Sequence, residues 1–155
     1  MSASPSLIGT TLDAYEIHAL LGSGGMATIY RGSDVNLHRS VAVKVLSTTL
    51  DADSSYVAHF RQEARLIASL RHAHIAQVYA FGEHAGTSYT IQELLPGSTL
   101  EQRLKDLADR HEHMPQQDVT AIITQLASAL DAAHTIAADQ WYAAARSRPK
   151  YYGRR

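Results

Sequence analysis

Apolar and polar residues alternate in the first part of the chain with the period of a β-strand. From residue 15 to residue 19 every second side chain is apolar, which predicts a strand that ends at a glycine-rich turn. A second strand is expected over residues 28–32, and residues 40–46 are rich in valine, as in a central strand. Two more strands are expected over residues 76–81 and 88–94, joined by a turn.

Three segments have the period of a helix. Residues 55–70 place Phe60, Ala64, Ile67 and Ala68 on one face. After the break at Pro96-Gly97, residues 98–101 form a capping box of the Ser-x-x-Glu type, which predicts the start of a second helix at that point. Pro115 suits the first turn of a third helix. The apolar positions of this third helix are Val119, Ile122, Ile123, Leu126, Ala129, Leu130 and Ala133.

These elements predict an α+β protein with a five-stranded antiparallel sheet and one packed helix, followed by two further helices. We expect a polar leader at residues 1–14, a sheet-bearing lobe at 15–95, a helical part at 96–134 and an irregular basic tail at 135–155. The tail is either a natural extension or an out-of-frame reading of a longer gene. Its basic residues are Arg146, Arg148, Lys150, Arg154 and Arg155.

Composition narrows the functional classes. Apolar residues make up 45% of the chain and charged residues 19%, which is typical of a globular protein. The net charge is -1, so no general attraction to nucleic acid or to an anionic membrane is expected. There is no cysteine, no apolar run of membrane-spanning length and no signal-peptide pattern. We therefore expect a cytoplasmic protein without a membrane segment.

Histidine pairs at His72-x-His74 and His111-x-His113 raise the question of a metal site. Neither pair has a cysteine or a carboxylate at a fitting spacing. We therefore expect surface or core histidines and no bound metal.

The glycine-rich turn is a candidate phosphate-binding loop. Glycines remove Cβ atoms, so backbone N–H groups can approach phosphate oxygens closely. The loop joins two strands, which argues against a dinucleotide-binding turn, and it lacks the Gly-Lys-Ser/Thr of a P-loop. Taken alone, the same glycines also fit a flexible hairpin tip.

Lys44 and Glu63 strengthen the phosphate-binding interpretation. Ala42 and Lys44 lie two residues apart on one face of a strand, so a flat base would fit over Ala42 and phosphates near Lys44. Glu63 lies at the edge of the apolar face of its helix, where a carboxylate needs a cation such as Lys44. The alternatives are a lysine that reaches out to water and a carboxylate on a solvated helix flank.

In this order, the motifs resemble the small lobe of bacterial eukaryotic-like serine/threonine protein kinases. The segments that carry the resemblance are Gly22-Ser23-Gly24-Gly25-Met26-Ala27-Thr28-Ile29-Tyr30, Val41-Ala42-Val43-Lys44, Phe60-Arg61-Gln62-Glu63-Ala64, Arg71-His72-Ala73-His74-Ile75, Ile91-Gln92-Glu93-Leu94-Leu95-Pro96-Gly97 and Gln125-Leu126-Ala127-Ser128-Ala129-Leu130-Asp131-Ala132-Ala133-His134. The resemblance covers about residues 7–134.

The resemblance implies ATP as the ligand and assigns a role to each matching residue. Leu21, Ile29 and Ala42 would enclose the adenine. Lys44 would contact the α- and β-phosphates and pair with Glu63. The loop residues that would cover the phosphates are Gly22, Ser23, Gly24 and Gly25, and Met26 and Ala27 would also belong to the ATP-binding set. The residues at the back and edge of the adenine are the gatekeeper Gln92 and the hinge residues Glu93 and Leu95. Two of these depart from the family pattern, since Ala27 replaces a glycine and the gatekeeper Gln92 is polar.

Catalytic motifs of the family are absent from the sequence. No His-Arg-Asp, Asp-Phe-Gly or Ala-Pro-Glu follows His134, and the only acid after Asp131 is Asp139. The catalytic base and the magnesium ligands are therefore missing, and the chain is expected to be an inactive, truncated kinase fragment. Two other hypotheses stay open: a nucleotide-binding, pseudokinase-like module, and an interaction protein that binds a partner or a second copy through the helix at residues 116–133.

Overall fold

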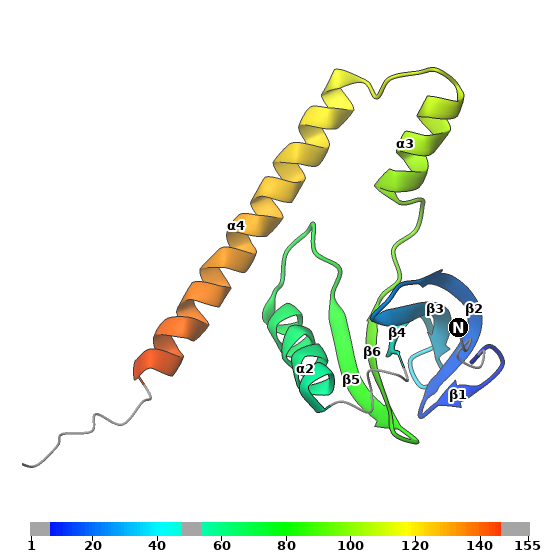
Figure 1. Cartoon of the computed structure of the whole chain (residues 1–155), viewed down its shortest axis with the longest axis vertical. Coiled ribbons are helices and arrows are strands. Elements are labelled where there is room, and N and C mark those ends of the chain that lie inside the picture. Colours follow the sequence, from blue (N-terminus) through cyan, green and yellow to red (C-terminus); the bar gives the residue numbers. More distant parts are fainter. Residues whose placement is uncertain (1–6, 48–53, 147–155) are drawn as a thin grey trace, which may run out of the picture. The chain divides into compact units, whose positions relative to one another are not determined.

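The computed structural model describes residues 7–47 and 54–146, which form two compact units (Figure 1). The first unit comprises Met1–Arg71 and Ala76–Gly97, and the second comprises His72–Ile75 and Ser98–Arg155. The first unit contains a sheet and one helix, and the second contains two helices. The α+β class expected from the sequence is therefore correct.

The sheet is antiparallel throughout and has the strand order β1-β2-β3-β4-β6-β5 (Figure 1). Its strands are β1 (Thr11–Leu12), β2 (Tyr15–Ser23), β3 (Ala27–Asp34), β4 (Arg39–Leu46), β5 (Val78–His84) and β6 (Thr87–Glu93). The strand rich in valine, β4, lies inside the sheet between β3 and β6, as its apolar sequence indicated.

The sheet has six strands rather than the expected five, because β1 lies in the segment expected to be a polar leader. Leu12 pairs with Tyr15 across a two-residue turn and is 4% exposed. The N–H of Ile17 also donates to the carbonyl of Thr10 at 2.9 Å. A two-residue strand is too short to show a period of two, so the alternation could not predict it.

Alternating residues of β4 build the core of the first unit. Val41 and Val43 are completely buried, and Ile91 on the paired strand β6 is buried to the same degree. Ile17 of β2 belongs to the same cluster and is 1% exposed. Each such side chain contributes roughly 1.5–3 kcal/mol by leaving water. This burial fixes which face of β4 points inward, so Ala42 and Lys44 must share the other face.

The two ends of the strand order meet at Asp13, because the sheet is strongly curled (Figure 1). Asp13 lies in the β1–β2 turn with a φ of 52°. Its carboxylate accepts a hydrogen bond from the hydroxyl of Tyr89 in β6, and His84 Nδ1 in β5 lies 3.0 Å from Asp13 Oδ1. Burial, and then the hydrogen bond to Asp13, raise the pKa of Tyr89.

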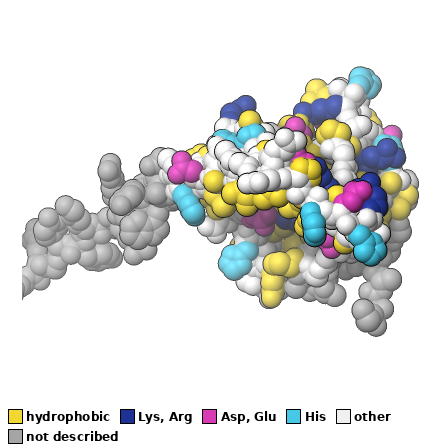
Figure 2. All heavy atoms as spheres, turned by 90° about the horizontal axis from the view of Figure 1, so that it is seen from above, with side chains coloured by type: hydrophobic (Ala, Val, Ile, Leu, Met, Phe, Trp, Pro, Cys, Tyr) yellow, Lys and Arg dark blue, Asp and Glu magenta, His cyan; other side chains and the backbone are white. Residues whose placement is uncertain are grey.

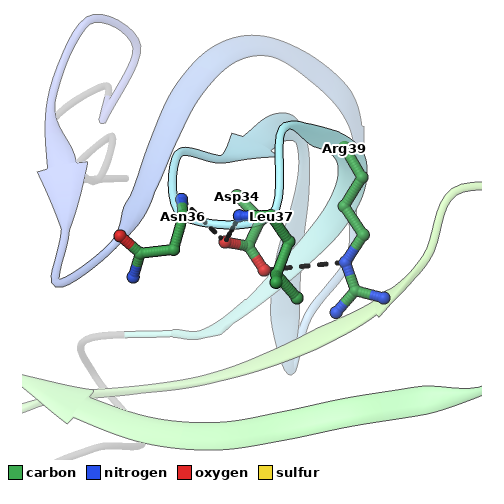
Figure 3. A network of polar contacts seen from close by, with 4 residues as sticks. All are labelled: Asp34, Asn36, Leu37 and Arg39. Atoms are coloured by element: carbon green, nitrogen blue, oxygen red, sulfur yellow. Dashed lines mark hydrogen bonds and ion pairs between the residues drawn. The ribbon is translucent and has the colours of Figure 1, made fainter.

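A second carboxylate, Asp34, fixes the turn between β3 and β4 (Figure 3). Its Oδ1 accepts from the N–H groups of Asn36 at 3.2 Å and Leu37 at 3.1 Å, and its Oδ2 lies 3.6 Å from Arg39 Nε. Asp34 is 4% exposed, so its oxygens depend on these donors. The guanidinium carbon of Arg39 lies 3.9 Å from the ring centroid of Tyr79 in β5. These contacts fix the register of β3 against β4.

The helix of the first unit, α2 (Ser54–Ser69), packs on β5 through its apolar face. Phe60 is 6% exposed and Ala64 is 5% exposed. Both residues belong to the face that the helical period predicted.

In the second unit, α3 (Leu100–Asp109) begins one residue later than the predicted capping box. Thr99, and not Ser98, is the N-cap, and its hydroxyl accepts from the N–H of Gln102 at 3.1 Å. Thr99 and Gln102 also have the Thr-x-x-Gln spacing of a capping box, so the sequence allowed two overlapping starts.

The last helix, α4 (Gln116–Arg146), continues well past His134, where the helical pattern fails. The expectation of an irregular tail from residue 135 is therefore wrong up to Arg146. The segment from 137 to 145 is rich in alanine, which has the highest helix propensity, so the helix can extend where the apolar period has ended. The rest of the basic tail lies outside the described residues.

Large apolar side chains of α3 and α4 are exposed within the described residues. Leu104 of α3 is 50% exposed, and Ile123, Leu126 and Leu130 of α4 are 59%, 53% and 50% exposed. Hydrophobic side chains lie open at the molecular surface in the space-filling view (Figure 2). The three positions on α4 belong to the apolar stripe that the sequence predicted for the third helix, and the second unit does not bury these side chains by itself.

Candidate functional site

Strand pairing brings the candidate residues of β3, β4 and β6 to one face of the sheet. Lys44 lies between Ile29 on β3 and Thr90 on β6, and Ala42 lies opposite Gln92. Because residues paired across strands share a face, these side chains form a continuous surface behind which Val41 and Val43 are buried. This face therefore places the small residue Ala42 and the cation of Lys44 beside the polar side chains of Thr90 and Gln92.

Lys44 and Glu63 are in contact, as expected from the sequence. Lys44 Nζ lies 2.9 Å from Glu63 Oε1, a distance typical of a charge-assisted hydrogen bond. The lysine side chain is 24% exposed and the glutamate side chain is 52% exposed. Helix α2 brings Glu63 to Lys44 because the neighbouring residues Phe60 and Ala64 are buried. They pack the side of the helix that carries Glu63 against the sheet. Both side chains of this pair therefore remain partly exposed to solvent.

Lys44 also contacts an aromatic ring, a partner that was not expected from the sequence. Its Nζ lies 5.5 Å from the centroid of the Phe60 ring, within the range of a cation–π interaction. The sequence contained one signal for this contact, because Phe60 precedes Glu63 by three residues and therefore shares its side of the helix.

Nothing in the described part of the chain requires glycine at the positions of the β2–β3 turn. Gly22, Gly24 and Gly25 do not have positive φ angles, unlike Gly9, Gly86 and Gly97. A Cβ atom would meet nothing within 4 Å at Gly22 or Gly25, and only Ala27 O at 3.8 Å at Gly24. Neither backbone conformation nor crowding by the protein therefore requires glycine here.

Not every backbone donor of this turn is available to a ligand. The N–H of Gly24 donates to Ala27 O at 3.0 Å and closes the tip of the hairpin. Ser23 Oγ and Thr28 Oγ1 lie 3.4 Å apart across the same hairpin. The N–H of Gly24 is thus already used within the hairpin.

The remaining apolar candidates lie around the β2–β3 turn and just after β6. Leu21 is 51% exposed next to an irregularity in the β2–β3 register, and Met26 at the turn is 64% exposed. Ile29 is 37% exposed, and Leu95, just after β6, is 61% exposed. These apolar side chains lack protein partners over much of their surface, as expected of groups that line a ligand site.

Two polar residues near the end of β6 are held by hydrogen bonds. Gln92 Nε2 donates to Thr90 Oγ1 at 3.2 Å, so Thr90, which is 2% exposed, orients Gln92. Thr90 lies two residues before Gln92 on the same face of β6, so the period of a strand is the signal that points to it. The N–H of Glu93 donates to Gln77 O at 2.8 Å, and the Glu93 carboxylate accepts from the Gln77 N–H at 3.1 Å. The backbone N–H and the carboxylate of Glu93 are therefore both used within the protein.

The histidine pairs do not gather metal ligands within the part of the chain that the structure describes. No group of three or more His, Cys, Asp or Glu residues has a metal-binding arrangement there. His72 instead uses both ring nitrogens: Nδ1 accepts from the N–H of His74 at 3.2 Å, and Nε2 lies 3.0 Å from Ser128 Oγ. None of the helices in the described ranges is long and apolar enough to cross a membrane.

Comparison with known proteins identifies the family. Residues 15–137 match the protein kinase domain. The chain belongs to the protein kinase family. This kinase chain is 39% identical over 127 residues to serine/threonine-protein kinase PknB of Mycobacterium leprae (strain TN), a match that covers 79% of the chain and 20% of PknB. It is also 39% identical over 131 residues to serine/threonine-protein kinase PknF of Mycobacterium tuberculosis (strain ATCC 25618 / H37Rv), covering 84% of the chain and 27% of PknF.

The fold of the kinase chain agrees with this assignment. The crystal structure of the Mycobacterium tuberculosis PknI kinase domain superposes with a TM-score of 0.68 and 32% identity. The match covers 82% of this chain and 50% of the PknI chain. The sheet with α2 is thus a kinase small lobe, and α3 and α4 are the first helices of a large lobe. The chain spans about a fifth of the length of PknB, about a quarter of the length of PknF and about half of the PknI kinase domain.

Proposed function

We propose that this chain is the ATP-binding portion of a serine/threonine protein kinase, which uses ATP to phosphorylate protein serine and threonine. The contact between Lys44 Nζ and Glu63 Oε1, at 2.9 Å, is the observation that carries the proposal. A kinase small lobe needs a fixed cation for the α- and β-phosphates, and a lysine held by a helix glutamate supplies it.

The sheet face supports a place for the adenine. Ala42 is small and leaves room for a flat ring, while Leu21 and Ile29 present exposed apolar surface beside it. Gln92, oriented by Thr90, would limit the space at the back. The hinge polar groups would be the carbonyl oxygen of Glu93 and the backbone of Leu95.

The turn between β2 and β3 supports a place for the phosphates. Gly22, Gly24 and Gly25 leave open space where side chains could have stood. Since the described chain does not require glycine at these positions, a bound ligand that needs close backbone approach accounts for them. Ser23, Met26 and Ala27 complete the loop over the phosphates.

Magnesium has no matching ligands in this chain. Kinases hold it with the aspartate of Asp-Phe-Gly and an asparagine of the catalytic loop, and neither motif occurs in the 155 residues. The described residues contain no cluster of carboxylates or histidines that would replace them. We therefore propose that the 155 residues by themselves bind ATP without transferring its phosphate, because the catalytic aspartate is also lacking.

Direct measurement of ATP binding tests the proposal. By isothermal titration, Lys44→Ala and Glu63→Ala should each lower the affinity for ATP by about tenfold or more, since a charge-assisted hydrogen bond contributes roughly 1.5–3 kcal/mol. Lys105→Ala and Glu101→Ala change the same residue types on α3 and should leave the affinity unchanged. Equal ATP affinity in all five proteins, or none in the wild type, would refute the proposed site. Transfer of phosphate by the pure chain would refute the proposed inactivity.

A second candidate is a pseudokinase-like module that acts by binding a protein partner or a second copy. The exposed apolar residues of α4, Ile123, Leu126 and Leu130, favour it. Sedimentation analysis of the wild type and of an Ile123→Glu/Leu126→Glu variant tests whether the chain associates with a second copy through α4. Self-association that the variant loses would support this candidate, and a monomer in both cases would remove the second-copy form of it.

A further inference from the structure

The environment of Lys44 contains more than its carboxylate partner. Phe60 is 6% exposed, and its ring lies 5.5 Å from the ammonium of Lys44. Phe60 and Glu63 lie three residues apart on α2, so both face β4. The ammonium thus contacts an aromatic ring and a carboxylate that are carried by adjacent turns of one helix.

The Phe60 ring is itself held by the sheet. Its centroid lies 6.1 Å from that of Phe81 in β5, with the two rings inclined by 58°. The guanidinium carbon of Arg61 lies 5.1 Å from the Phe81 ring centroid. Lys44, Phe60, Phe81 and Arg61 therefore form a series in which two neighbouring rings are flanked by a cation on each side, and the series joins β4, α2 and β5.

Solvent weakens the attraction between the Lys44 ammonium and the Phe60 ring less than it weakens the Lys44–Glu63 ion pair. The Glu63 side chain is 52% exposed, so water and salt screen its attraction for Lys44. The Phe60 ring is buried, and its negative π face attracts the ammonium of a lysine whose side chain is only 24% exposed. The lysine side chain is flexible, so an exposed carboxylate alone holds it in one conformation for only part of the time. A second contact, with the ring, keeps the ammonium in that conformation more of the time.

We propose that Phe60 is a positioning residue for Lys44: its ring face holds the ammonium beside Glu63, where it can meet the phosphates of ATP. The link to phosphates rests on the proposed function, whereas the placement of the ammonium by the ring does not. Phe81 supports the ring but has no role in the direct contact with Lys44.

Graded fluorination of the ring tests this role without emptying the core. Replacing Phe60 by mono-, di- and trifluorophenylalanine keeps the ring shape but progressively weakens its negative face. We expect ATP affinity to fall stepwise, to about one fifth in the trifluoro protein, because the interaction contributes about 1 kcal/mol at a partly exposed site. The same series at Phe81 is the matched control and should leave ATP affinity unchanged.

A nuclear magnetic resonance measurement separates this inference from the proposed function. In the wild type, the Lys44 ε-methylene protons should be shifted upfield by the ring current of Phe60, and Phe60→Leu should abolish that shift while Phe81→Leu retains it. If the wild type binds no ATP, the proposed function fails, yet the shift still decides whether Phe60 places the ammonium. An unshifted Lys44 in the wild type, or equal ATP affinities across the Phe60 series, would overturn the inference.

Discussion

Gly82 is the position where the smallest substitution should have a large effect on stability. A Cβ atom added there would lie 2.4 Å from both Cζ and Oη of Tyr89 and 2.9 Å from its Cε1. Tyr89 lies opposite Gly82 on β6, is 2% exposed, and packs edge-on against Tyr15 at 6.2 Å between ring centroids. Its hydroxyl is also bound to Asp13, so the ring has no free direction in which to move.

We therefore expect Gly82→Ala to lower the free energy of unfolding by about 2 kcal/mol. Overpacking of a well-packed core costs roughly 1–3 kcal/mol. The lower backbone entropy of alanine in the unfolded chain offsets about 0.5–1 kcal/mol of this. The site lies at the upper end of the overpacking range because the clash involves a pinned aromatic ring.

Urea denaturation followed by circular dichroism measures the effect, with Gly25→Ala as the matched control. A Cβ atom at Gly25 meets nothing within 4 Å, so that variant should stay within about 0.5 kcal/mol of the wild type. A double-mutant cycle with Tyr89→Leu adds a second check, because Gly82→Ala should cost little once the ring is gone. The reasoning is refuted if Gly82→Ala and Gly25→Ala have the same stability, or if the Tyr89→Leu background does not relieve the loss.

Two further variants test the turns at the ends of the sheet. Ala85 and Gly86 both have positive φ in the two-residue β5–β6 turn, a conformation that favours Asn-Gly. Ala85→Asn should therefore raise the free energy of unfolding by about 0.5–1 kcal/mol in the same urea assay. No gain in stability would contradict the turn assignment. The hydrogen bonds from Tyr89, and then from His84, lower the pKa of Asp13 below its usual 3.8. The stability that this carboxylate contributes is therefore present above about pH 4 and is lost as the pH falls through the lowered pKa. Asp13→Asn should remove that part of the acid dependence in unfolding curves between pH 2 and 5, and identical pH profiles would argue against the Asp13 contacts.

The strands and the paired charges were predictable because each depends on a short repeating pattern. Val41 and Val43 alternate with Ala42 and Lys44, so the period of two was enough to separate the buried face from the open one. Glu63 lies at the edge of an apolar helix face, where its distance from the core could be judged from the helical period alone.

The features that were missed depend on contacts between distant segments or on a choice between equal local signals. β1 exists because Leu12 and Thr10 find partners on β2, which no two-residue pattern can indicate. The N-cap of α3 was ambiguous because Ser98 and Thr99 both have a suitable residue three positions later. The contact of Phe60 with Lys44 was missed because the apolar period marks a ring as buried but does not say which charge lies over it.

The N-terminal segment has a practical consequence for anyone who shortens this polypeptide. The stretch that matches the kinase domain starts at residue 15. A protein cut at that boundary would lack Leu12, a member of the buried cluster, Leu7, which packs against it, and Asp13. Trimming to the recognised domain would thus uncover apolar surface and expose the hydrogen-bonding edge of β2, which favours aggregation. Expression should therefore begin no later than Leu7.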